Sequence, residues 1–145
     1  MFGMIPGLEN AEFVRYGVMH RNTFLPSPGR LGWDYACKAA PQLYFAGQIT
    51  GVEGYIESAG SGLAAGIELA RRIDGREPLD FTSETALGAL AHYVSEYGGG
   101  DFQPMNINFG ILSPIANAPK GKKARYEALS ARALAHIREI IANRM

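Results

Sequence analysis

The stretch from Leu43 to Arg72 constrains the fold of this chain more than any other segment. It begins with an apolar run, Leu43 to Ala46, that is typical of a buried parallel strand. Three glycines follow the run and precede a predicted helix that ends near Ile73: Gly47, Gly51 and Gly54. Glycine lets backbone approach a ligand closely, and the first turn of a helix presents unpaired N–H groups. Strand, glycine turn and helix in this order indicate an element that binds a nucleotide cofactor.

The residue pattern inside this helix predicts where it packs and where it stops. Small residues recur at four-residue spacing, which predicts one closely packed face: Ser58, Gly62 and Gly66, with Ala59 and Ala65 beside them. Thr50 and Glu53 have the spacing of a capping box. Asp74-Gly75 predicts the C-terminal end.

The rest of the chain predicts two more helices and little sheet. A short strand is expected within residues 33–37 and an extended segment over residues 102–112. One helix is expected over residues 83–97 with Ser83 as its N-cap, and another over residues 122–143. These elements fit the α/β class but are too few for a complete doubly wound fold.

Composition excludes several functional classes. The 14 Lys and Arg residues balance the 14 Asp and Glu residues, so no overall field indicates a nucleic-acid partner. The single cysteine, Cys37, excludes an intrachain disulfide and a cysteine-rich metal site. His92 and His136 have no partners at metal-ligand spacing and are read as surface residues, so no metal is expected. No signal peptide or apolar run of membrane-spanning length is found, and we expect a cytoplasmic protein without a membrane partner.

The glycine turn also carries a family resemblance. Glycine spacing alone equally fits a strand–helix turn in any α/β protein. The full string Gly47-Gln48-Ile49-Thr50-Gly51, followed by Glu53-Gly54-Tyr55, resembles the second flavin-contacting segment of the folate- and FAD-dependent tRNA (uracil-5-)-methyltransferases. Three further strings are similar to the same family, in the same order: residues 5–23, 102–110 and 125–134. The sister family, glucose-inhibited division protein A, has a related turn, but Val52-Glu53 favours the methyltransferases.

This resemblance implies the C-terminal third or so of a longer enzyme. The expected fold is α/β, a partial FAD-binding Rossmann-like domain with a C-terminal helical segment. Residues 1–75 would be the C-terminal part of the FAD-binding domain, with the flavin-contacting strand–turn–helix at 43–73, and residues 76–145 would complete the same domain. The G-x-G-x-x-G motif that holds the FAD pyrophosphate in the family is not found after a strand near the start of this sequence.

The resemblance also implies the chemistry. In this family 5,10-methylenetetrahydrofolate donates a methylene group to C5 of a T-loop uridine in tRNA, and hydride from NAD(P)H, carried on FAD, converts it to methyl. The nucleophilic cysteines of the family lie in upstream segments, and Cys37 is read as a small apolar filler. No catalytic residue is therefore assigned, and we expect the chain to be inactive alone, with a possible upstream partner chain carrying the rest of the enzyme.

Cofactor binding is expected of ten residues in two segments. They are Gly47, Gln48, Ile49, Thr50, Gly51, Gly54 and Tyr55, together with His20, Arg21 and Asn22. The glycine segment is expected to act mainly through its backbone, with Glu53 capping the helix or facing away. Arg21 is a candidate for pairing with a folate carboxylate and His20 for stacking on a ring, while a polar loop is the alternative.

Two further groups of polar residues each fit two interpretations, one as ligand contacts and one as ordinary structure. Asn106 and Asn108 would share one side of an extended segment, where they either contact a ligand or bond to neighbouring backbone. The basic cluster either contacts tRNA phosphate or is simply solvated: Lys120, Lys122, Lys123 and Arg125.

Three alternative functions stay open. The first is part of the sister enzyme that modifies wobble uridines. The second is a non-catalytic truncated or split-gene fragment that acts only as a flavin- and tRNA-binding module. The third is a redox flavoprotein without an RNA substrate.

Overall fold

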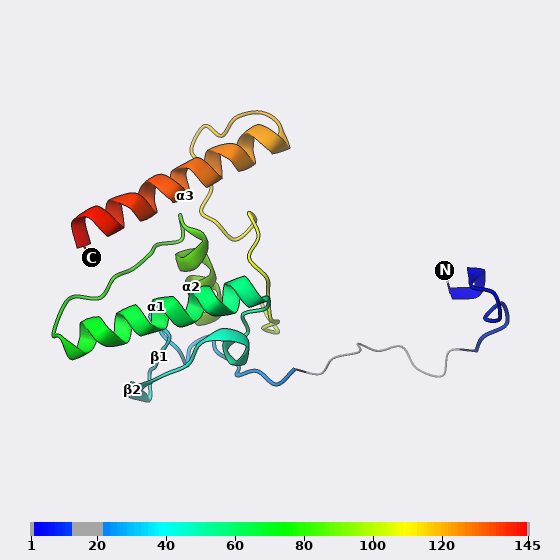
Figure 1. The fold of residues 1–145 in the computed structure, drawn as a ribbon, viewed down its shortest axis with the longest axis horizontal. Coiled ribbons are helices and arrows are strands. Elements are labelled where there is room, and N and C mark those ends of the chain that lie inside the picture. Colours follow the sequence, from blue (N-terminus) through cyan, green and yellow to red (C-terminus); the bar gives the residue numbers. More distant parts are fainter. Residues whose placement is uncertain (1, 13–21, 145) are drawn as a thin grey trace.

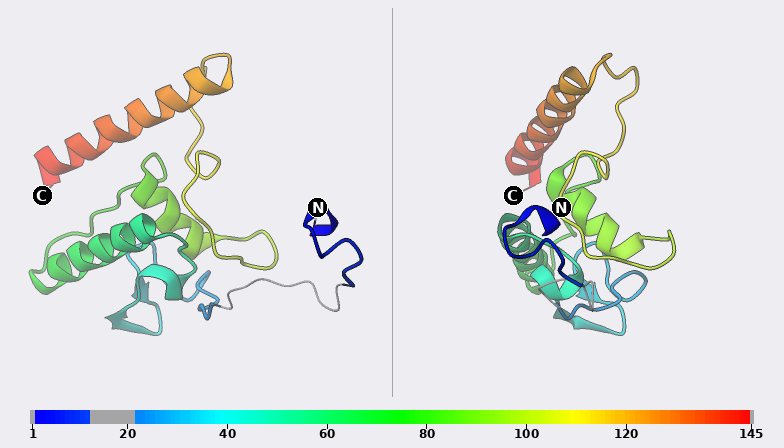
Figure 2. Two further views of the ribbon diagram at one scale, coloured as in Figure 1. Left: turned by 45° about the vertical axis from the view of Figure 1, so that its right-hand side comes forward. Right: turned by 90° about the vertical axis from the view of Figure 1, so that its right-hand side faces the viewer.

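The computed structural model describes residues 2–12 and 22–144 and contains three α-helices and one small sheet (Figure 1). In chain order the elements are η1 (Phe2–Met4), β1 (Ala36–Cys37), β2 (Ala40–Tyr44), η2 (Gly47–Thr50), α1 (Tyr55–Ile73), α2 (Ala86–Glu96) and α3 (Lys122–Arg144). α1 packs against both η2 and α2, and α3 lies on the side of α1 and α2 away from the small sheet (Figures 1 and 2). The fold is therefore a small α/β arrangement, in agreement with the predicted class.

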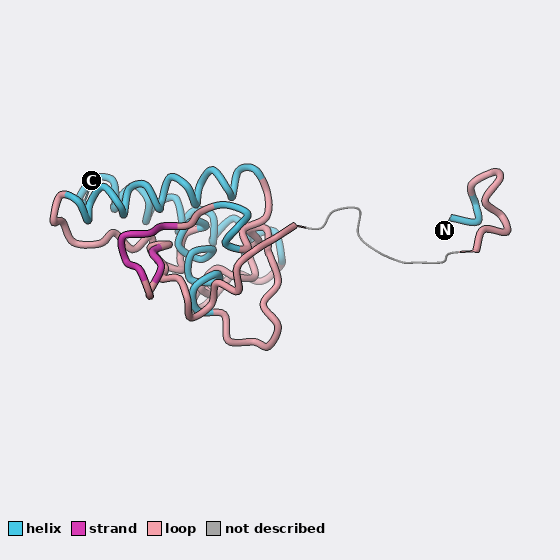
Figure 3. The backbone as a smooth tube through the Cα atoms, turned by 90° about the horizontal axis from the view of Figure 1, so that it is seen from below, coloured by secondary structure: helices cyan, strands magenta, loops and turns pink. Residues whose placement is uncertain are grey.

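The sheet differs from the strand expected at residues 43–46. β1 and β2 pair antiparallel as neighbours along the chain, with Ala36 opposite Tyr44 and an irregularity before Cys37 (Figure 3). Leu43 is 47% exposed. The prediction of a buried parallel strand is wrong because, among the described residues, no third strand joins this pair. An apolar run alone does not distinguish a buried strand from a short hairpin arm.

Helix α1 runs over the predicted residues but packs through a different face. Its buried side consists of Ser61, Ala64, Ala65, Glu68 and Arg71. Gly62 and Gly66 are exposed, and a Cβ atom added at either would meet nothing within 4 Å. The closely packed face expected at Ser58, Gly62 and Gly66 is therefore not the face that packs in the described chain.

The helix ends also test the predicted caps. Gly54 is the N-cap of α1, and the Thr50 hydroxyl donates to the Gly47 carbonyl at 2.7 Å, so the predicted capping box is wrong. Asp74 ends α1 as expected, and Gly75 follows in the left-handed region. The N-cap of α2 is Thr85, two residues after the predicted Ser83, and its hydroxyl accepts the Gly88 N–H at 3.0 Å.

One main core joins α1 and α2 to the segments around them. Buried residues at its centre are Tyr35, Val52, Leu79, Leu90 and Val94. Glu68 is buried at their edge and accepts the Leu79 N–H at 2.9 Å. Burial raises the pKa of this carboxyl. Val52 directly follows Gly51, so its burial in this core anchors the glycine turn.

His92 and His136, predicted as surface residues, are both partly buried. The His92 ring stacks on Trp33 and lies 3.2 Å from Asp80 Oδ1 and 3.1 Å from Glu96 Oε2. Partial burial alone lowers the pKa of His92, but the hydrogen bonds to Glu96 and Asp80 outweigh it, so the pKa is raised. His136 Nδ1 lies 3.9 Å from Glu84.

Helix α3 packs on a second, smaller apolar cluster that contains Leu112 and Leu129. The Arg132 guanidinium donates to the carbonyls of Ser113 and Pro114 and lies 3.5 Å from Glu84. These contacts attach the loop before α3 to the helix itself.

Candidate functional site

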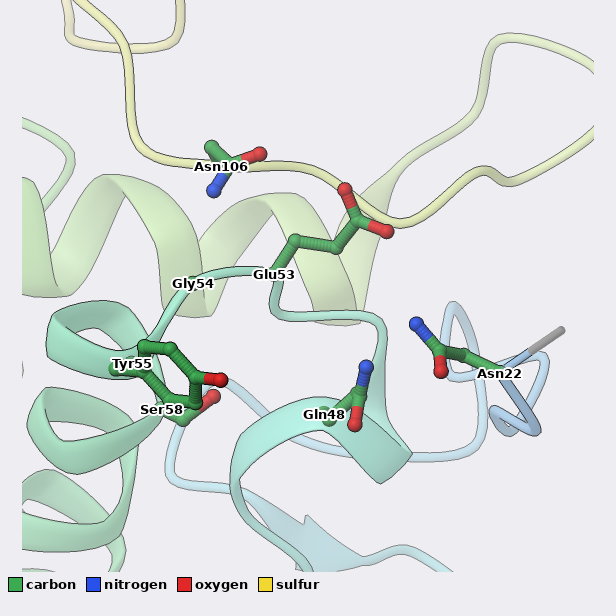
Figure 4. A pocket seen from close by; sticks show the side chains of 7 residues that line it. All are labelled: Asn22, Gln48, Glu53, Gly54, Tyr55, Ser58 and Asn106. Carbon is green, nitrogen blue, oxygen red and sulfur yellow. The ribbon is translucent and has the colours of Figure 1, made fainter. Parts of the chain in front are cut away.

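A hollow of about 460 Å³ lies where the glycine turn meets the first turn of α1 (Figure 4). Seven residues line it: Asn22, Gln48, Glu53, Gly54, Tyr55, Ser58 and Asn106. They come from four segments: the chain before β1, η2, the turn into α1 with its first helical turn, and the extended segment before α3. A volume of this size suits a small-molecule or cofactor fragment.

The glycine turn is fixed to α1 by hydrogen bonds. Gly47, at a φ of 70°, donates its N–H to Ser61 Oγ at 2.7 Å, and this hydroxyl donates to the Ser58 carbonyl at 2.9 Å. A Cβ atom on Gly47 would lie 3.5 Å from Ser58 Cβ, which is ordinary contact, so the positive φ is the stronger reason for glycine here. η2 is thus held directly against the start of the helix.

The segment before α3 closes the other side of the hollow. Glu53 donates its N–H to the Met105 carbonyl at 3.0 Å, and Met105 donates to the Gly51 carbonyl at 2.9 Å. This short parallel pairing places Asn106 beside Gly54. A Cβ atom on Gly51 would lie 2.6 Å from Phe102 Cε1, so only glycine fits beneath that ring.

The N-terminus of α1 opens toward the hollow without a side-chain cap. Gly54 has a φ of 95° and a ψ of 148°, a region that essentially only glycine adopts. The first intrahelical bond runs from the Ser58 N–H to the Gly54 carbonyl, and the N–H groups of residues 55–57 have no hydrogen-bond partner among the described residues. These groups and the helix macrodipole present partial positive charge. The Glu57 carboxylate folds back beside Gly54, with its Cδ 2.6 Å from where a Cβ would stand.

Most side chains around the hollow are neutral and polar. Gln48, Asn22 and Asn106 offer amide donors and acceptors, and Figure 4 shows them on different sides of the space. Tyr55 is 97% exposed at its mouth, so its ring is available for contact with a ligand. The Glu53 carboxylate points away from Tyr55 and Ser58 (Figure 4). The predicted alternative in which Glu53 caps the helix is not what the structure shows.

The predicted cofactor-binding residues divide into three groups. Those that line the hollow are Asn22, Gln48, Gly54 and Tyr55. Those that support the turn without lining it are Gly47, Thr50 and Gly51, which are buried, and Ile49, whose carbonyl accepts the Leu25 N–H. His20 and Arg21 lie outside the described residues.

Sequence reasoning missed or left open three lining residues. Ser58 was read only as part of a packing face, although its position one turn after Gly54 signals the same helix end. Glu53, expected to cap the helix or to face away, is among the lining residues. Asn106 lines the hollow, whereas the Asn108 side chain accepts the Gly110 N–H at 2.8 Å and forms a turn. Asn108 thus bonds to neighbouring backbone, and contact of Asn106 with a ligand stays a prediction.

Other kinds of site are not found in the described chain. Among residues 2–12 and 22–144, no three His, Cys, Asp or Glu side chains are grouped to hold a metal ion. No helix in these ranges combines the length and apolar character needed to cross a membrane. Cys37 is partly buried in β1.

Comparison with known proteins identifies the family. The family model described as Glucose inhibited division protein A matches residues 1–77. A methylenetetrahydrofolate--tRNA-(uracil-5-)-methyltransferase of Enterococcus faecalis is 57% identical over 92% of this chain and 31% of its own length. Proteins of the same name are 53% identical in Streptococcus agalactiae, over 97% of this chain and 32% of their length, and 56% identical in Bacillus licheniformis, over 94% and 32%.

The chain therefore spans about a third of the length of these relatives. The family model covers more than half of the chain and includes the glycine turn that carries the hollow. The chain belongs to the Glucose inhibited division protein A family, and its predicted resemblance to the folate-dependent tRNA (uracil-5-)-methyltransferases is confirmed.

Proposed function

We propose that this chain supplies the flavin-ring side of an FAD site in an enzyme that methylates C5 of a T-loop uridine in tRNA with 5,10-methylenetetrahydrofolate. The observation that carries this proposal is the position of the hollow. It lies on the same Gly47–Tyr55 string that resembles the flavin-contacting segment, in a chain more than half identical to enzymes named for this reaction.

The residues present fit the pyrimidine end of a flavin. That edge alternates carbonyl acceptors with an N–H donor, which the amides of Gln48, Asn22 and Asn106 can match. A reduced flavin carries negative charge at the same end, and the uncapped N-terminus of α1 supplies partial positive charge to it. The Glu57 carboxylate lies beside Gly54 without lining the hollow, and it has to turn away when a negatively charged ring edge binds next to it.

The proposed roles of the residues in the whole enzyme follow from this placement. Bound FAD would carry hydride from NAD(P)H to the methylene group that folate donates. The described residues would bind and orient the flavin ring of FAD. Gln48 and Asn106 contact it from two sides, the α1 N–H groups lie along its edge, and Tyr55 lies at the mouth of the hollow. His20 and Arg21 are proposed as further cofactor contacts, and Gly47, Ile49, Thr50 and Gly51 as the frame of the turn.

The proposal extends to the domain organisation. Residues 1–75 would form the C-terminal part of an FAD-binding Rossmann-like domain, and residues 76–145 would complete it. The phosphate-binding half of the site, the catalytic cysteines and the folate site would come from parts of the enzyme outside this sequence. We propose a cytoplasmic enzyme that acts on tRNA.

A chimeric enzyme tests the proposal. The segment of the Enterococcus faecalis relative that precedes its matching region is joined to this chain, and the product is assayed for the flavin absorption band and for folate-dependent methylation of unmodified tRNA. Gln48→Ala should weaken flavin binding, because the exposed Gln48 side chain has no partner within the described chain that its loss would disturb. Gln42→Ala is the matched control, since Gln42 is equally exposed on β2. A colourless chimera, or equal flavin affinity in both variants, would refute the proposed site.

A further inference from the structure

The start of α3 carries an unusual concentration of positive charge. Residues 102–126 contain no Asp or Glu, in a chain whose charges otherwise balance. This stretch ends in a basic cluster: Lys120, Lys122, Lys123 and Arg125. The first turn of α3 contains no acidic residue, so its cations stand at the positive end of the helix macrodipole. Such an arrangement costs helix stability unless an anion is bound there.

An aromatic pair lies directly against this cluster. The rings of Phe109 and Tyr126 stack with centroids 4.3 Å apart and an interplanar angle of 20°. Lys122 Nζ lies 5.6 Å and Arg125 Cζ 5.9 Å from the Tyr126 ring centroid. Phe109 remains 38% exposed. Cations over a ring next to an accessible aromatic face are the combination that binds unpaired nucleotides.

The same residues open onto a groove of about 510 Å³ between α3 and the loop that precedes it. Its walls include Phe109, Tyr126 and Arg125, with Pro114 and Ile115 from the loop. Arg132 holds this loop in place through the carbonyls of Ser113 and Pro114. These hydrogen bonds order one wall of the groove, which lowers the cost of ordering it on binding.

We propose that this groove binds an unpaired stretch of tRNA, with a base on the exposed side of the Phe109 ring, which Tyr126 supports from behind, and the flanking phosphates on Lys122 and Arg125. Charge complementarity favours this occupant: no carboxylate lines the groove, and within the described chain the only acidic side chain paired with the cluster is Glu127, 4.0 Å from Lys123. Four neighbouring cations fit the regularly spaced phosphates of a nucleic-acid backbone, and the stacked aromatic rings beside them fit its bases rather than the carboxylates of an acidic peptide. The identity of the RNA rests on the proposed function; the surface itself does not.

Salt-dependent binding of an unmodified tRNA transcript to the full chain tests the charges. Lys122→Gln/Arg125→Gln should lower the slope of log affinity against log salt by about 1.4 to 1.8, because two phosphate contacts are lost. Arg30→Gln/Lys38→Gln removes the same charge from exposed positions near β1 and should leave the slope unchanged. Equal slopes in the two double variants would overturn the proposal.

A second pair of variants tests the stacking. Phe109→Ala should weaken tRNA binding at least about five-fold with no change in salt slope, and Phe109→Tyr should retain most of the affinity. Circular dichroism of each variant confirms that it is folded before binding is compared. If folded Phe109→Ala binds as tightly as the parent chain, or if the parent chain binds no tRNA, the groove is not an RNA site. These readouts require no flavin, so a colourless chimera with normal tRNA binding would refute the proposed function and leave this surface standing.

Discussion

Replacing Gly54 by alanine tests the part of the structure on which the proposed flavin site depends. Gly54 is the N-cap of α1, with a φ of 95° and a ψ of 148°. An added Cβ would lie 2.6 Å from Glu57 Cδ and 2.9 Å from Asn106 Nδ2. The substitution therefore forces both a strained backbone and the movement of two side chains.

The expected loss of stability follows from the strained backbone and from the close contacts of the added Cβ atom. An alanine in this backbone region costs about 1–3 kcal/mol. The close contacts add less, because Glu57 and Asn106 are met at the ends of flexible side chains and can rotate away. We expect Gly54→Ala to lower the free energy of unfolding by about 1–3 kcal/mol.

Urea unfolding of the purified chain measures this change, and Gly66→Ala is the matched control. Gly66 lies inside α1, has no positive φ, and has nothing within 4 Å of an added Cβ. The same substitution there should stabilise the chain by about 0.5–1 kcal/mol, because alanine loses less conformational freedom than glycine in a helix. The two variants should thus shift stability in opposite directions.

Flavin titration of the chimeric enzyme gives the second readout for Gly54→Ala. Rearranged Glu57 and Asn106 side chains would stand where the ring edge is proposed to lie, so flavin affinity should fall together with stability. If Gly54→Ala unfolds at the urea concentration of the parent chain and binds flavin equally well, the backbone reasoning for this helix end is wrong.

Three further perturbations have expected outcomes for the stability of the chain. Glu68→Ala leaves the buried Leu79 N–H without its acceptor and should cost about 1–3 kcal/mol in urea unfolding, whereas Glu68→Gln, which keeps an acceptor oxygen, should cost less. Thr85→Ala removes the cap on Gly88 and should cost about 1–2 kcal/mol by the same measurement. Because the pKa of His92 is raised, its ion pairs add their full share to the free energy of unfolding at pH values below the unfolded pKa of about 6.5. This stabilisation is lost as the pH rises through the folded pKa. His92→Gln should flatten that part of the pH profile of unfolding, and an unchanged profile would show that the pairs contribute nothing.

The helices could be predicted from the sequence because their signals are local. α1 and α3 begin and end within a residue or two of the predicted limits, since Gly54, Gly75 and Gly121 interrupt the helical pattern where the backbone takes a positive φ. The predicted position of α2 is correct, but its predicted N-cap is wrong. Ser83 and Thr85 are both good caps by residue type, and the structure uses Ser83 for a hydrogen bond to Ser113, thirty residues away. A long-range partner of this kind leaves no local signal.

The candidate site could be predicted only on the side that one continuous segment provides. Gln48, Gly54 and Tyr55 lie in the glycine string and line the hollow. Asn106 reaches it through the pairing of Met105 with Gly51 and Glu53, a contact across about fifty residues that no spacing rule specifies. The same limit explains the strand error, because pairing partners decide whether an apolar run is buried.

The failed capping box shows why this helix end suits a ligand. Thr50 and Glu53 have the correct spacing, but Gly51 and Gly54 both take positive φ, and the helix begins after them. The Thr50 hydroxyl turns back to the Gly47 carbonyl and cannot reach the helix N–H groups. A side-chain cap would have satisfied those donors and closed the site. The glycines that prevent the local capping box are therefore what leaves the α1 N-terminus without a side-chain cap, open toward the hollow.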